Sequence, residues 1–120
     1  MIKVLTVDDS RTMRDMLRLA LAGGGFDVVQ AVDGEHGLEV LGENGADVII
    51  TDINMPKLDG FGFIERVRSD DTYRATPILV LTTESDPDKK NRARTAGATG
   101  WIVKPFNPEK LVEVVKKVAA

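Results

Sequence analysis

The chain alternates between two patterns of apolar residues. Short runs rich in β-branched side chains, typical of buried strands, occur at Val4–Val7, Val28–Val32, Val48–Thr51, Ile78–Leu81 and Trp101–Val103. Between these runs, apolar residues recur every three or four positions, which predicts helices with one buried face. Three such stripes are clear: Met13, Met16, Leu17, Ala20 and Leu21; Phe63, Ile64 and Val67; and Leu111, Val114, Val115 and Val118. Two weaker helices are expected at Glu35–Leu41 and Asp88–Ala96.

Capping residues support these boundaries. Four helix starts carry a side chain suited to an N-cap, namely Ser10, Asp59, Asp86 before Pro87, and Asn107 before Pro108. Glycines at 23–25 and at Gly97 are expected to end helices in the left-handed conformation.

Five strands that alternate with five helices predict an α/β fold, with helices on both faces of a parallel sheet. Because crossover connections are right-handed, the favoured topology is a flavodoxin-like (βα)5 doubly wound five-stranded parallel sheet of order 2-1-3-4-5. A chain of 120 residues has the usual size of one domain. We therefore expect residues 1–120 to form a single unit without an output domain.

Composition excludes several classes of function. Sixteen basic and nineteen acidic residues give a net charge of −3, which argues against binding to nucleic acid or to an anionic membrane. The chain has no cysteine and one histidine, His36, so thiolate sites, disulfides and multi-histidine metal centres are excluded. No apolar run approaches the length of a membrane span, and the start of the chain does not resemble a signal peptide. We expect a cytoplasmic monomer.

Acidic residues stand at the ends of two strands that should be neighbours. Asp8 and Asp9 follow the first strand and Asp52 follows the third, where the strand order reverses and where such sheets bind ligands. Neighbouring strands lie about 4.8 Å apart, so the carboxylates would repel one another unless a cation joins them. Mg²⁺, a hard ion with oxygen ligands, suits this position. Helix capping by Asp8 and Asp9 and a loop position for Asp52 are the alternatives.

Two further strand ends converge on the same edge. The fourth strand ends in Thr82-Thr83 and the fifth in Lys104-Pro105. A hydroxyl and an ammonium that face a carboxylate and Mg²⁺ suit a phosphoryl group, whose transfer requires mainly positioning and charge neutralisation. Asp52 is then interpreted as the nucleophile that accepts the phosphoryl group as an acyl phosphate.

Four stretches together carry a specific resemblance to a known family. They are VDDSRTMR (7–14), TDINMPKLDGF (51–61), LTTES (81–85) and GATGWIVKPF (97–106). Their residues and spacing resemble the response-regulator receiver domain, in particular the single-domain regulators of chemotaxis, and the similarity covers the whole chain. The family has the strand order given above, so that order is not an independent prediction.

The resemblance implies a role for each strand-end residue. Asp52 matches the phosphoacceptor. Asp8 and Asp9, with Asp52 and the backbone carbonyl of Asn54, match the ligands of Mg²⁺. Thr82 matches the hydroxyl that moves toward the phosphoryl group, and Lys104 matches the lysine that pairs with it, followed by a cis bond to proline.

Four further positions are implied to adjust the switch. Trp101 matches the switch aromatic of the fifth strand, which is usually Tyr or Phe in the family. Thr83 stands where Ala or Gly is common, and it is expected to affect access to the phosphoryl pocket. Asn54 and Glu84 flank the pocket at positions where the family tunes hydrolysis.

The resemblance also implies partners. The phosphoryl donor would be a CheA-like histidine kinase, and the receiver would catalyse only its own phosphorylation and dephosphorylation, so it is not an enzyme in the usual sense. Output would pass through the face formed by the 88–96 helix, the fifth strand and the last helix, to a flagellar motor switch protein or another effector peptide. A phosphatase is a further partner.

Three alternatives stay open. The first is a phosphate sink or shuttle that shares a kinase without binding the motor. The second is an FMN-binding flavodoxin-like protein, although Asp8-Asp9 has the wrong charge for its phosphate loop. The third is a phosphatase similar to haloacid dehalogenases, although those carry the nucleophile on the first strand within an Asp-x-Asp pair.

Overall fold

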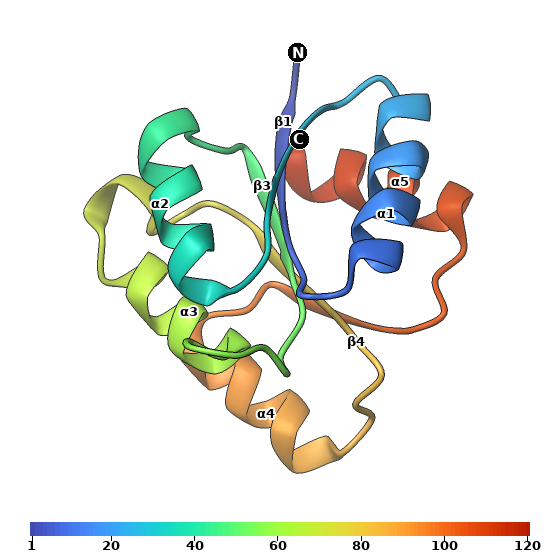
Figure 1. Ribbon diagram of the computed structural model, residues 1–120. Coiled ribbons are helices and arrows are strands. Elements are labelled where there is room, and N and C mark those ends of the chain that lie inside the picture. Colours follow the sequence, from blue (N-terminus) through green and yellow to red (C-terminus); the bar gives the residue numbers. More distant parts are fainter.

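The five apolar runs form one parallel sheet in the order β2-β1-β3-β4-β5, as predicted, in the computed structural model, which describes residues 1–120 (Figure 1). In chain order the elements are β1 (Lys3–Val7), α1 (Arg11–Gly23), β2 (Asp27–Ala31), α2 (Gly34–Asn44), β3 (Val48–Thr51), α3 (Gly60–Arg68), a short 3-10 helix η1 (Asp71–Tyr73), β4 (Ile78–Thr82), α4 (Pro87–Ala96), β5 (Gly100–Val103) and α5 (Pro108–Ala119).

Helices cover both faces of the sheet (Figure 1). The pair α1 and α5 packs on one face, and α2, α3 and α4 pack on the other. Alternate side chains of β4 enter the two cores: Leu79 and Leu81 face α1 and α5, whereas Ile78 and Val80 face α2 to α4. Burial on both faces explains why the central strands are unbroken apolar runs. None of the helices combines the length and apolar character needed to cross a membrane.

The predicted helix starts are confirmed. The four capping side chains, Ser10, Asp59, Asp86 and Asn107, each accept a hydrogen bond from a backbone N–H in the first turn. Helix α2 is longer than its predicted range of 35–41, and it begins at an additional cap, Asp33. Its glycines weakened the pattern but have a packing reason, since a Cβ on Gly37 would lie 2.8 Å from the Phe63 ring.

The glycines that were predicted to end helices in the left-handed conformation do so only in part. Gly97 ends α4 with a left-handed φ of +119°. In contrast, the C-cap of α1 is Gly24 with a φ of −83°, and the positive φ of +86° comes one residue later at Gly25. The second strand also begins one residue earlier than predicted, at Asp27.

Hydrogen bonds extend the sheet by one residue at its carboxyl edge. The Asp52 N–H donates to the carbonyl oxygen of Val7 at 3.0 Å, and the Lys104 N–H donates to that of Thr82 at 2.8 Å. These bonds fix the backbone of the first residue after β3 and after β5. Side chains from separate parts of the chain are therefore held together along one edge.

Candidate functional site

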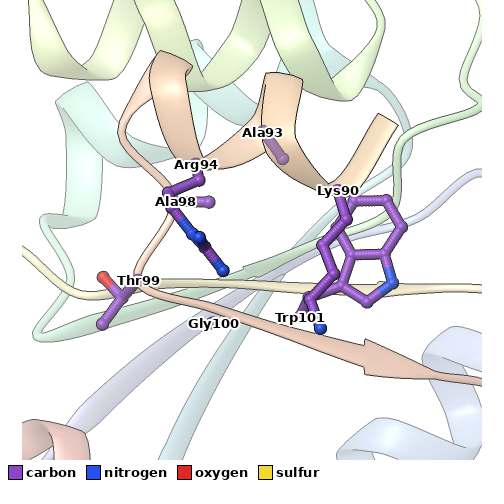
Figure 2. A pocket seen from close by; sticks show the side chains of 7 residues that line it. All are labelled: Lys90, Ala93, Arg94, Ala98, Thr99, Gly100 and Trp101. Atoms are coloured by element: carbon purple, nitrogen blue, oxygen red, sulfur yellow. The ribbon is translucent and has the colours of Figure 1, made fainter. Parts of the chain in front are cut away.

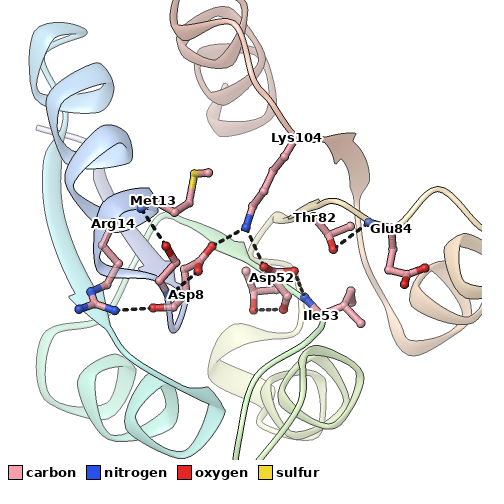
Figure 3. Close-up of polar contacts among 10 residues, drawn as sticks. Asp8, Met13, Arg14, Asp52, Ile53, Thr82, Glu84 and Lys104 are labelled. Atoms are coloured by element: carbon pink, nitrogen blue, oxygen red, sulfur yellow. Dashed lines mark hydrogen bonds and ion pairs between the residues drawn. The ribbon is translucent and has the colours of Figure 1, made fainter.

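Three charged side chains meet at the carboxyl edge (Figure 3). The Lys104 Nζ lies 2.9 Å from Asp8 Oδ2 and 2.7 Å from Asp52 Oδ2. All three side chains are largely buried, with exposed fractions of 11% for Lys104, 2% for Asp8 and 11% for Asp52. One ammonium between two carboxylates leaves a negative charge uncompensated in a poorly solvated place, which favours the binding of a further cation.

Each carboxylate is oriented by a second hydrogen bond. Asp8 Oδ1 accepts from the Ser10 N–H at 2.9 Å, and Asp52 Oδ1 accepts from the Ile53 N–H at 2.6 Å. Arg14, near the start of α1, donates to the backbone carbonyl of Asp8 at 2.9 Å. Both acids are thus held in place before any ligand arrives.

Gly60 allows α3 to begin directly against the end of β3. Its N–H donates to the carbonyl of Ile53 at 2.8 Å. A Cβ at this position would lie 2.3 Å from the backbone oxygen of Asp52, so a larger residue would push Asp52 out of place. Gly60 in the 51–61 motif therefore has a steric role, beside the capping role of Asp59.

Burial raises the pKa of Asp8, against the hydrogen bonds from Ser10 and Lys104 and the charge of Lys104, which lower it. The negative charge of Asp52 raises it further, so repulsion between the acids exists but burial is the larger cause. For Lys104, burial favours the neutral amine, but the hydrogen bonds and charges of Asp52 and Asp8 outweigh it and raise its pKa. Lys104 therefore stays a cation at neutral pH.

Asp9 completes an acidic cluster. One carboxylate oxygen each from Asp8, Asp9 and Asp52 lies within 4.8 Å of the others, with Asp9 exposed and the other two buried. Three oxygen ligands on one side and solvent on the other suit a hard divalent cation that retains several waters, as Mg²⁺ does. The predicted convergence of these three residues is confirmed by the geometry.

Two hydrogen bonds lead from Thr82, at the end of β4, to Trp101 in β5. The buried Thr82 Oγ1 accepts from the Glu84 N–H at 3.3 Å, and the Glu84 carbonyl accepts from the Trp101 indole N–H at 3.2 Å. The side chains of Thr83 and Asn54 are exposed and form none of the contacts that hold the charged centre. Their effects on access and hydrolysis stay predictions.

Two residues of the site were not identified from the sequence. Arg14 holds the backbone of Asp8, and Lys89 forms an ion pair with Glu84, with 3.1 Å between Nζ and Oε1. Each lies near the start of the helix that follows a strand of the site. A basic residue in that position was the available signal, but its partner depends on loop geometry.

The parallel sheet with acids after β1 and β3, a hydroxyl at the end of β4 and a lysine after β5 defines a receiver. The family model described as "Response regulator receiver domain" matches residues 4–116, and the chain belongs to this family. This match favours a receiver over the FMN-binding flavodoxin-like protein and the dehalogenase-like phosphatase that the sequence left open.

Relatives that function in chemotaxis match nearly the whole chain. The chemotaxis protein CheY1 of Helicobacter pylori is 40% identical over 118 residues, which cover 97% of this chain and 95% of that protein. A probable CheY of Rhizobium etli is 38% identical over 118 residues, covering 98% and 92%. The structure of CheY4 of Vibrio cholerae superposes with a TM-score of 0.94 at 47% identity and covers 98% of both chains.

The chain is accordingly a receiver domain similar to CheY chemotaxis regulators. Receivers of this kind are signalling switches that take phosphoryl groups from histidine kinases onto an aspartate and act on effectors. They bind Mg²⁺ in an acidic cleft, and in this chain Asp8, Asp9 and Asp52 form a cluster of acids.

Proposed function

We propose that this chain is a stand-alone response regulator that accepts a phosphoryl group on Asp52 from a histidine kinase and signals in chemotaxis. The observation that carries the proposal is the ion pair of Lys104 with Asp52, 2.7 Å long and next to the acidic cluster. Chemotaxis relatives matched over 92% and 95% of their own lengths support the stand-alone role.

In the proposed reaction, a carboxylate oxygen of Asp52 attacks the phosphorus of the kinase phosphohistidine. The new O–P bond forms as the N–P bond breaks, and the imidazole leaves with the electron pair of that bond. Lys104 transfers its hydrogen bond from Asp52 to a phosphoryl oxygen and neutralises part of its charge. Because Asp52 Oδ1 is already fixed by the Ile53 N–H, little reorganisation is needed.

The ligands proposed for Mg²⁺ are the carboxylates of Asp8, Asp9 and Asp52 and the backbone carbonyl of Asn54. When bound, the ion supplies positive charge to the phosphoryl oxygens and compensates the negative charge of the buried acids. Ser10 and Lys104 keep Asp8 directed into the site, and the exposed Asp9 leaves one side open to solvent and donor. The proposed location is the cytoplasm, where histidine kinases are phosphorylated by ATP.

Thr82 is proposed to turn its hydroxyl toward the bound phosphoryl group. It would then lose its hydrogen bond from the Glu84 N–H, and the loop that Trp101 holds through the Glu84 carbonyl would move. Trp101 is therefore proposed as the switch residue, with Thr83, Asn54 and Glu84 tuning access and hydrolysis around the pocket.

The proposed output face is formed by α4, β5 and α5. A groove of about 250 Å³ between α4 and β5 is lined by Lys90, Ala93, Arg94, Ala98, Thr99, Gly100 and Trp101 (Figure 2). Helix α4 buries only Ala93, and its Arg92 lies over the Phe61 ring with 4.1 Å to the centroid. Few buried apolar contacts make α4 easy to displace, which suits a switch.

Labelling with acetyl phosphate tests the proposed phosphoacceptor. Wild type should incorporate phosphate in the presence of Mg²⁺, whereas Asp52→Asn, or wild type with a chelator, should lose roughly 100-fold or more of the rate because the nucleophile or the ion is missing. Intact-protein mass spectrometry measures the incorporation. Equal labelling of wild type and Asp52→Asn would overturn the assignment.

Peptide binding then separates the two output roles. A motor regulator binds a flagellar-switch peptide more tightly once phosphorylated, and this is the result expected here. A phosphate sink would show labelling without a gain in peptide affinity, so isothermal titration of the beryllofluoride-treated protein distinguishes the two.

A further inference from the structure

All the polar groups of Glu84 are occupied, each by a different element. Its N–H donates to Thr82 Oγ1 in β4, its carbonyl accepts from the Trp101 indole in β5, and its carboxylate pairs with Lys89 in α4. The Glu84 and Lys89 side chains are 28% and 42% exposed, so the pair is only partly solvated. Glu84 is therefore fixed at the junction of phosphoryl pocket, switch strand and output helix.

The position of Lys89 is unusual for a helix start. It is the third residue of α4, after the cap Asp86 and Pro87. The backbone N–H groups of a first helical turn carry partial positive charge, so acids are favoured there and a lysine is unfavourable. The ion pair with Glu84 offsets this cost and so explains why a lysine is tolerated in the first turn.

The Glu84 carboxylate is directed away from the charged centre. In Figure 3 it lies beyond Thr82, on the side opposite Asp52 and Lys104. Its backbone is nevertheless only two residues from Thr82, so a released side chain could turn toward the pocket. That pocket already holds three carboxylates within 4.8 Å of one another, and a fourth would repel an incoming phosphoryl group.

We infer that Lys89 is a positioning residue for phosphoryl acceptance, because it holds the Glu84 carboxylate out of the pocket. This inference rests on the proposed function. It couples α4 to the chemistry: an acidic partner that binds α4 and draws Lys89 to itself would release Glu84. Since coupling between two sites is reciprocal, phosphorylation would in turn affect how readily Lys89 is available to that partner.

The test is the rate of phosphorylation by acetyl phosphate in a double-mutant cycle of Lys89 and Glu84. Lys89→Gln should lower the rate roughly three- to tenfold, as expected for one unpaired charge several ångströms from the reacting group. In a Glu84→Gln background the same substitution should change the rate by less than about 1.5-fold, because no carboxylate remains to be released.

Two controls separate this role from helix stability and from net charge. Lys89→Arg keeps the ion pair and should retain the wild-type rate. Lys117→Gln removes the same charge from an exposed position on α5 and should also leave the rate unchanged. An unchanged rate in Lys89→Gln, or an equal decrease in both backgrounds, would overturn the inference while wild-type labelling stands. Absence of labelling in wild type would instead defeat the proposed function itself.

Discussion

The interior of this molecule and the carboxyl edge of its sheet treat charge in opposite ways. The two cores beside the sheet are made of apolar side chains, and the polar Thr6 and Thr51 within the strands are hydrogen-bonded. The buried acids, Asp8, Asp33 and Asp52, all follow strand ends at the carboxyl edge. Two of them share one lysine, which leaves that part of the edge with excess negative charge.

The contrast shows where stability is sacrificed for binding. Buried acids with incomplete compensation destabilise the folded state, while the apolar cores supply the stability that tolerates them. The proposed cation site requires this imbalance, because an edge whose charges were fully compensated would not attract a cation. Substitutions in the two regions should therefore have opposite consequences for stability and activity.

The largest effect is expected in the interior. Leu21→Ala on α1 should lower the free energy of unfolding by about 2–5 kcal/mol, because Leu21 is fully buried. Leu19→Ala on the same helix is the matched control, since Leu19 is 80% exposed and its loss should change stability by at most about 0.5 kcal/mol. Urea unfolding measures both. Similar changes in the free energy of unfolding of the two variants would contradict the distinction between core and surface. The labelling rate of either variant, measured on folded protein, should equal that of wild type.

A smaller effect is expected when the edge receives its cation. Mg²⁺ at ten times its dissociation constant should raise the free energy of unfolding by about 1.4 kcal/mol, because it binds the folded state only. Asp8→Asn should abolish this gain, whereas Asp15→Asn, an exposed acid of α1, should retain it. Urea unfolding at constant ionic strength, with and without the ion, gives the comparison. A Mg²⁺ response that survives in Asp8→Asn would place the ion elsewhere.

The smallest effect concerns pH in the absence of Mg²⁺. Burial raises the pKa of Asp8 above its usual 3.8, so the folded state holds this proton to higher pH than the unfolded chain does. The Asp8 contribution to stability is present below about pH 3.8 and is lost as pH rises through the folded-state pKa. Asp8→Asn should therefore gain stability relative to wild type as pH rises from that value. If the free energies of unfolding of wild type and Asp8→Asn changed equally with pH across this range, burial would not raise the pKa of Asp8.

The convergence of the site could be predicted because strand ends are fixed by topology. Asp8, Asp52 and Lys104 each come directly after a strand, so the order of strands alone places them at one edge. The cis bond before Pro105, implied by the family resemblance, is present as well.

The contacts around Glu84 could not be predicted in this way. The hydrogen bond of the Trp101 indole and the ion pair of Lys89 depend on how the loop after β4 turns, which no apolar pattern encodes. The predicted range of α2 was too short for a related reason. Gly34 and Gly37 lower the helix propensity of this segment, and only close neighbours in the fold require them to be glycine.

The indole of Trp101 has one more consequence. It is the chain's only tryptophan, and its N–H is bonded to the loop that leaves β4. Ultraviolet emission from an indole depends on the polarity and hydrogen bonding around its ring. Any rearrangement of that loop should therefore change the intrinsic fluorescence of the protein, which can be followed without a dye or label.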